Sequence, residues 1–160
     1  MSVSIESNVE AVDKEFARRI EMSLFAIGDT VLENAVESIS GTFEFSMKAV
    51  DTGRLRASLS FVTPKGQGGI SQFYPEENSE PEDLLNFESE SNTVIIGTNV
   101  DYSEYVHNGT QKMSPRPFLI DGVNRSSERI EELLNQILGE EKYTLNTSIL
   151  LGEKKGGKKK

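Results

Sequence analysis

The stretch SNVEAVDKEFARRIEMSLFAIGDTVLENAVESISG, residues 7–41, contains the longest element that the sequence predicts. Its apolar residues recur at steps of three and four, the spacing of one face of an α-helix: Val9, Val12, Phe16, Ile20, Leu24, Ile27, Val31, Ala35 and Ile39. Ser7 and Glu10 have the spacing of a capping box, and Gly41 stands where a C-terminal cap glycine is common. We therefore predict one long helix from Ser7 to about Ser40.

Two features of this helix concern its shape and its packing. Gly28 and the β-branched pair Thr30 and Val31 are weak helix formers, so we expect the helix to bend or split near them. The apolar stripe is narrow for so long a helix, which suits either a core or a contact between subunits. We expect at least half of its length to pack on the core.

The next stretch, DTGRLRASL at residues 51–59, predicts a turn followed by a short helix. Asp51 or Thr52 can cap that helix, and Leu55 and Leu59 are four residues apart, on one face. Strand periodicity follows at once, because residues 58–63 alternate polar and apolar side chains before Pro64.

Residues 64–92 change character, with three of the five prolines and seven acidic residues against one lysine. We predict a long exposed loop or a hairpin excursion, which contributes little to the stability of the monomer. A buried strand follows at residues 93–98 and ends near Gly97.

The C-terminal part of the domain predicts two more helices. In DYSEYVHNGT, residues 101–110, Asp101 and Glu104 form a second capping-box pattern, and Gly109 can adopt the left-handed conformation that ends a helix. Helical periodicity returns from about residue 117 and continues to Gly139. Beyond it, residues 140–160 combine a weak strand pattern with a lysine-rich tail, and we expect an extended arm that either adds a strand to a neighbour's sheet or folds back on its own domain.

The predicted order of elements is typical of an α+β domain. We expect a single domain over residues 1–139, with a small, mostly antiparallel sheet packed against the long N-terminal helix and a C-terminal helix. A small core should join the short helices to the sheet, and its expected members are Leu55, Leu59, Tyr102, Tyr105, Val106 and Phe118. Three arginines are expected to face outward, toward acidic partners: Arg54, Arg56 and Arg116.

Composition excludes much of the common catalytic chemistry. The 160 residues contain no cysteine and one histidine, His107, so disulfides, thiol nucleophiles and most zinc sites are excluded. The glycines of residues 66–69 lack phosphate-loop spacing, and the acidic cluster within residues 76–83 lacks the ordering of a calcium loop. We expect no catalytic residue, no cofactor and no metal site. A metal-dependent hydrolase using the loop carboxylates is the weakest alternative.

The charge of the chain is asymmetric. The net charge is −9, but the last eight residues carry +4, so residues 1–152 carry −13. An acidic body argues against a broad DNA-gripping surface, because DNA binding depends on the neutralisation of phosphates by Lys and Arg. The lysine tail could touch nucleic acid or remain solvated. No apolar run exceeds four residues and no signal-peptide pattern opens the chain, so we expect a soluble, unexported protein without a membrane span.

Three strings in this order, DTGRLRASL, TVIIGTN with DYSEYVHNGT, and SPRPFL, resemble the gene-product-ten-like head-tail joining family of tailed bacteriophages, also called tail-completion or neck proteins. The resemblance covers residues 51–119. It departs from the family pattern at Ser103, where alanine is usual, and at His107, where an acidic residue is usual.

The resemblance implies a structural protein of the virion with no catalytic activity. Copies of the chain, most simply six, would form a ring between the head and the tail, and genomic DNA would pass through it without sequence-specific binding. The neighbours would be connector or head-closure proteins on one side and tail-terminator or tail-tube proteins on the other. The resemblance assigns the interface or structural-motif role to Asp51, Thr52, Gly53, Arg54, Leu55, Tyr102, Tyr105, Gly109, Thr110, Arg116, Pro117 and Phe118.

The expected location is the neck of the virion, and the host cytoplasm during assembly. A small acidic adaptor or regulatory protein, which binds a protein partner as a monomer or dimer, is the alternative from another class.

Overall fold

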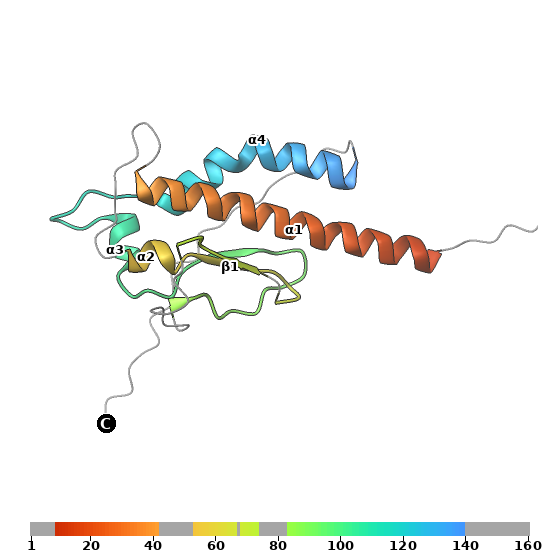
Figure 1. Cartoon of the computed structure of the whole chain (residues 1–160), viewed down its shortest axis with the longest axis horizontal. Helices are drawn as coiled ribbons and strands as arrows, with labels where there is room; N and C mark the ends of the chain where they lie inside the picture. The colour runs from red at the N-terminus through yellow and green to blue at the C-terminus, as the bar shows by residue number, and fades with distance from the viewer. Residues whose placement is uncertain (1–8, 42–52, 67, 74–82, 140–160) are drawn as a thin grey trace, which may run out of the picture.

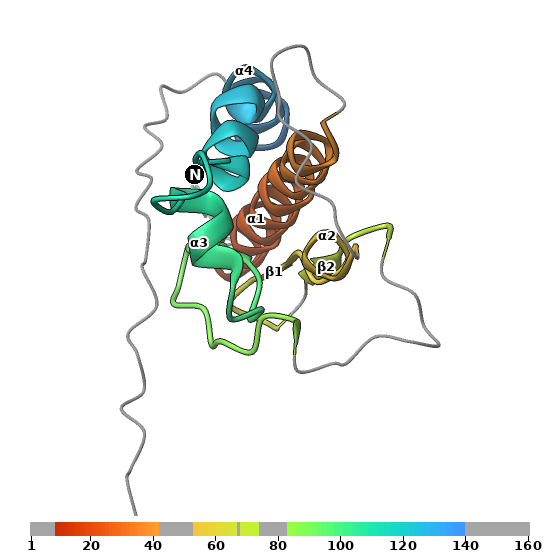
Figure 2. The ribbon, with the colours of Figure 1, turned by 90° about the vertical axis from the view of Figure 1, so that its left-hand side faces the viewer.

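The computed structural model describes residues 9–41, 53–66, 68–73 and 83–139. These residues form an α+β fold in which a long helix, α1 (Val9–Ser40), lies between a second helix on one side and a small sheet on the other (Figure 1; Figure 2). The second helix is α4 (Phe118–Leu138). The predicted fold class is therefore confirmed, whereas the arm at residues 140–160 lies outside the described residues.

Helix α1 runs without interruption through Gly28, Thr30 and Val31, so the expected bend is absent and that prediction is wrong (Figure 1). The hydroxyl of Thr30 donates to the carbonyl of Ala26 at 2.7 Å, inside the regular helix. Gly28 instead marks a close approach, because a Cβ at this position would lie 2.4 Å from a ring carbon of Phe61. The expected capping serine, Ser7, lies outside the described residues.

Helix α4 packs antiparallel to the C-terminal half of α1. The hydroxyl of Ser38 donates to the carboxylate of Asp121 at 2.9 Å, near the start of α4. One turn further, the amide of Asn34 donates to the hydroxyl of Ser126 at 2.9 Å. Gly122 allows the close contact between the helices, since a Cβ there would lie 2.9 Å from the Cβ of Ala35. An apolar cluster continues the contact: Val31, Ile130 and Leu134, with Ile27 and Leu138 packed against it.

The sheet has three antiparallel strands in the order β2-β1-β3. Strands β1 (Ser60–Val62) and β3 (Ile95–Gly97) lie within the predicted strands. Strand β2 (Gly68–Ile70) forms a hairpin with β1, inside the segment predicted as a loop or hairpin excursion. Phe61, at the centre of β1, stands opposite Gly69 and Ile96.

The ring of Phe61 occupies a slot between α1 and β2 and is 1% exposed. Glycine lines both sides of the slot, because a Cβ on Gly28 or on Gly69 would lie 2.4 or 2.6 Å from the ring. Phe25 meets the ring edge-on at a centroid distance of 5.3 Å. The surrounding core cluster consists of Leu32, Val36, Ile39, Leu55, Leu59, Phe61, Val100 and Phe118.

Two short helices lie beside the sheet, and both start without a side-chain cap. Helix α2 (Arg54–Ala57) follows Gly53, whose φ is +82°, and the expected caps Asp51 and Thr52 lie outside the described residues. Helix α3 (Ser103–Asn108) has Tyr102 at its N-cap position with no side-chain hydrogen bond. The capping box predicted there is therefore wrong.

The predicted small core is correct for the aliphatic residues and for Phe118, but it is wrong for the tyrosines. Tyr102 and Tyr105 are 39% and 54% exposed. Helix α3 has only six residues, and it turns Val106 and His107 toward the core instead.

The segment before β3 is more structured than predicted. The carbonyl of Asp83 accepts a hydrogen bond from the backbone N–H of Asn99 at 2.9 Å, and the N–H of Leu85 donates to the Ser60 hydroxyl at 3.0 Å. Strand β2 agrees with the predicted hairpin excursion, and these contacts tie residues 83–85 to the rest of the domain, although residues 74–82 lie outside the described part.

Candidate functional site

The three strings that carry the family resemblance meet in one hydrophobic cluster. Leu55 and Leu59 come from the first string, Val106 from the second and Phe118 from the third, and Val100 lies between the two parts of the second string. All of them pack with the C-terminal half of α1. These residues therefore build the fold, and the surface around them presents the side chains available for contact with partners.

The single histidine belongs to this core. His107 is 8% exposed, and its ring meets Phe118 edge-on at a centroid distance of 5.3 Å. Its Nδ1 lies 3.1 Å from the Asn108 side-chain oxygen, while Nε2 has no hydrogen-bond partner among the described residues. Packing against an aromatic ring gives the histidine a structural role.

The described residues contain neither a metal-ligand cluster nor a membrane-spanning helix. There, no group of three His, Asp or Glu side chains could hold a metal ion. Within those ranges, no helix is both long and apolar enough to cross a membrane.

Arg54 binds within its own chain. Its Nε and one terminal nitrogen donate to the two carboxylate oxygens of Asp83, each at 2.7 Å. The Asp83 side chain is 12% exposed, and these hydrogen bonds lower the pKa of Asp83, although burial opposes the shift. The bidentate pair ties α2 to the segment before β3, while the Arg54 side chain is still 53% exposed, so its contact with an external acidic partner stays a prediction.

We expect the Arg54–Asp83 pair to make stability depend on pH. Because the folded pKa of Asp83 lies below its unfolded value, near 3.9, the pair stabilises the fold fully above that value and loses its effect as the pH falls through the folded pKa. Asp83→Asn should therefore lower the free energy of unfolding at about pH 7, and the difference from wild type should shrink below about pH 4. Urea unfolding across this range measures the difference. Asp29→Asn, on the exposed surface of α1, is the control, and a difference that stays constant with pH would contradict the expectation.

The other two arginines are more buried than Arg54. The Arg56 guanidinium lies 3.7 Å from the centroid of the Phe73 ring, and its Nε is buried without a hydrogen-bond partner in the described structure. The backbone N–H of Arg116 donates to the carbonyl of Val106 at 3.0 Å. Both side chains are half-buried, so they contact the domain itself along part of their length.

Gly109 and Thr110 form a tight turn that folds back on α3. Gly109 follows α3 with a φ of +76° and a ψ of 176°, which differs from the predicted left-handed helical conformation, and a Cβ there would lie 2.7 Å from the backbone nitrogen of Pro115. Thr110 and Met113 form an isolated β-bridge. Pro117 then occupies the N-cap position of α4, directly before the buried Phe118.

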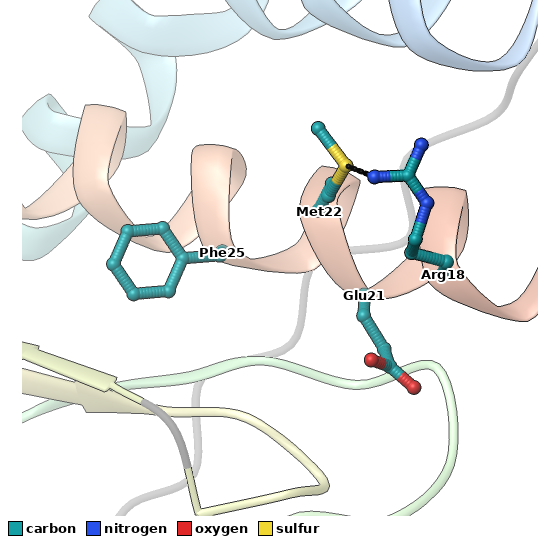
Figure 3. Close-up of a pocket in the computed structure, with 4 residues that line it drawn as sticks. All are labelled: Arg18, Glu21, Met22 and Phe25. Atoms are coloured by element: carbon teal, nitrogen blue, oxygen red, sulfur yellow. Dashed lines mark hydrogen bonds between the residues drawn. The ribbon is translucent and has the colours of Figure 1, made fainter.

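One exposed surface lies on the N-terminal half of α1. Arg18, Glu21, Met22 and Phe25 line an open hollow of about 300 Å³ (Figure 3). Met22 and Phe25 are 47% and 41% exposed, and the Arg18 guanidinium contacts the Met22 sulfur at 3.6 Å. Glu21 pairs with Lys65 of the β1–β2 hairpin. We call these four residues the helix patch.

Basic side chains border the helix patch. Arg18 and Arg19 both donate to Glu15, and these hydrogen bonds lower the pKa of Glu15 to about 2. Two guanidinium groups against one carboxylate leave this turn of α1 with a net positive charge.

A second exposed surface lies on α3, at the opposite end of the molecule from the start of α1 (Figure 1). It consists of Tyr102 and Tyr105 with the exposed acidic residues Asp101 and Glu104, and we call it the tyrosine patch. Its flanking charge is opposite in sign to that beside the helix patch. The two surfaces are therefore complementary in charge, and each exposes two large apolar or aromatic side chains.

Of the residues that the sequence assigned to the site, Tyr102 and Tyr105 are the two with large exposed aromatic surfaces. Sequence reasoning did not identify Met22 and Phe25. Both residues lie outside the apolar stripe that predicts α1. Large apolar residues outside the main stripe of a helix are the signal that could have indicated a second contact surface.

Comparison of this chain with protein-family models, with curated proteins and with solved structures finds no match.

Proposed function

We propose that this chain is a structural protein of the neck of a tailed bacteriophage. Its copies close into a ring, most simply a hexamer, between the DNA-filled head and the tail. The observation that supports the ring best is that one subunit exposes two different patches of complementary charge, the helix patch on α1 and the tyrosine patch on α3. Head-to-tail contacts that close into a ring need two such different surfaces on every copy.

The chemistry of the two patches favours a direct contact between them. In the proposed ring, Tyr102 and Tyr105 of one subunit lie against Met22 and Phe25 of the next. Tyrosine, methionine and arginine are enriched in interface cores, and an aromatic ring interacts favourably with both a sulfur atom and a guanidinium group. The carboxylates beside the tyrosines then approach Arg18, and this attraction favours contact between the tyrosine patch and the helix patch.

The acidic charge of the chain suits a ring through which DNA passes. Residues 1–152 carry a net charge of −13. Like-charge repulsion keeps phosphates from binding to the wall of such a channel, so DNA slides through without being held. The two rims of the ring would bind a connector or head-closure protein and a tail-terminator or tail-tube protein, and catalysis has no part in this proposal.

A mixing experiment tests the contact. One variant, Tyr102→Ser with Tyr105→Ser, loses the tyrosine patch; the other, Arg18→Glu with Met22→Glu, loses the helix patch. Each should weaken the contact on the order of a hundredfold, since buried aromatic and arginine side chains dominate interface energies. Each variant alone should then be monomeric by native mass spectrometry.

A mixture of the two variants retains exactly one intact pair of patches, so it should form 1:1 heterodimers and nothing larger. Phe87→Ser is the control, because Phe87 is 58% exposed and belongs to neither patch; this variant should still form the ring. The proposed contact would be contradicted by a mixture that stays monomeric, or by either patch variant alone forming rings.

A further inference from the structure

The apolar stripe of α1 that packs on α4 continues beyond α4 without a partner among the described residues. Ile27 and Val31 belong to the contact with α4. Further toward the N-terminus, the same stripe passes through Ile20, Phe16 and Val12 at steps of four. Phe16 and Val12 are 57% and 66% exposed, and Figure 1 shows α1 running on past the end of α4.

The register of the two helices places the end of α4 where this exposed stripe starts. The Ser38 hydroxyl bonds Asp121, and Leu138, the last residue of α4, packs against the same cluster as Ile27. The helix stops at Gly139, whose φ of +100° redirects the chain. The polypeptide therefore leaves α4 beside the first uncovered turn of α1.

The segment that follows has the composition and the length to cover the stripe. Residues 140–151 contain five large apolar side chains: Tyr143, Leu145, Ile149, Leu150 and Leu151. The stripe from Ser23 to Val12 is ~17 Å long at the helical rise of 1.5 Å per residue. Twelve extended residues reach up to ~40 Å, which leaves ample chain for a turn after Gly139.

We propose that residues 140–151 fold back onto their own α1 and cover Val12, Phe16 and Ile20. Burial of these apolar side chains stabilises the contact. Attachment through Gly139 gives the segment an effective local concentration in the millimolar range, which favours its own helix over that of a second copy. Its first residues, Glu140 and Glu141, enter beside Arg19, whose side chain is 49% exposed.

This contact does not rest on the proposed function. It uses a different side of α1 from the helix patch, whose apolar members are Met22 and Phe25. The stripe can therefore be covered whether or not the protein forms a ring, and each idea can fail alone.

Because the chain contains no cysteine, two introduced cysteines can form a disulfide only with each other or with those of another copy. Ala17→Cys places a thiol on the exposed surface next to Phe16, and Thr144→Cys places the second thiol within the segment. The control pairs Thr144→Cys with Glu33→Cys, which is exposed on the C-terminal half of α1, outside the stripe. Under mild oxidation, the Ala17 pair should form an intramolecular disulfide at least on the order of tenfold faster than the control pair, at a rate independent of protein concentration.

Two results would overturn the proposal. Equal rates for the two pairs would show that the segment does not lie on the stripe. Disulfide-linked dimers that accumulate with rising protein concentration would assign the stripe to the segment of a second copy.

Hydrogen exchange provides a second measurement that needs no cross-link. Leu145→Ser with Ile149→Ser should speed amide exchange in residues 12–20 on the order of tenfold, because that part of α1 loses its cover. Asn146→Ser with Thr147→Ser, in the same segment, should leave exchange unchanged. If the first pair also leaves it unchanged, the fold-back contact is wrong.

Discussion

Replacing Phe118 by alanine is expected to lower the free energy of unfolding by about 3–5 kcal/mol. Phe118 is 2% exposed and belongs to the cluster in which the short helices, the sheet and α1 meet. Its removal leaves a cavity and deprives the buried ring of His107 of its edge-on contact. Denaturant unfolding followed by circular dichroism measures the loss.

The control for this variant is Phe87→Ala, because Phe87 is 58% exposed. It should change the free energy of unfolding by no more than about 0.5 kcal/mol. If Phe118→Ala kept the stability of the wild type but abolished assembly, Phe118 would belong to an interface, and its place in the core would be wrong.

The second large effect concerns Gly28, where alanine should destabilise the protein by about 1–3 kcal/mol through overpacking. Helix propensity alone predicts the opposite sign, since alanine is better than glycine by about 1 kcal/mol in a helix interior. Packing prevails because the new Cβ would lie 2.4 to 2.8 Å from three ring carbons of Phe61. The ring cannot move away, since Gly69 leaves no spare room on its other side.

A double-mutant cycle isolates this clash. In a Phe61→Leu background, Gly28→Ala should cost less than it does in the wild type, because the smaller side chain leaves space for the new methyl group. A Gly28→Ala variant more stable than the wild type would show that the ring is not confined between the two glycines.

The elements with strong local signals were predictable from the sequence. The steps of three and four along residues 7–40 predict α1, and the alternation at residues 58–63 predicts β1. Strand β2 has no such signal, because its sequence is Gly68-Gly69-Ile70. A side chain at position 69 would clash with the ring of Phe61. Such a requirement of tertiary packing produces no local sequence pattern.

Long-range pairing limited the prediction of the site in the same way. Asp83 appeared to be one more charge in an acidic loop, but it is the partner of Arg54, 29 residues away. Tyr102 and Tyr105 were predicted to lie in the core, but both are exposed, and their role in an interface stays a prediction. The six-residue helix α3 cannot bury two tyrosines together with Val106 and His107, so exposure of the tyrosines follows from its length.

Native mass spectrometry of the unmodified 160-residue chain tests the proposed assembly most directly. Over a series of increasing concentrations, a closed ring, most simply a hexamer, should appear without a ladder of open oligomers, because closure satisfies every pair of patches at once. A chain that stays monomeric or dimeric at every concentration would contradict self-assembly through the two patches, and would favour a small acidic adaptor protein.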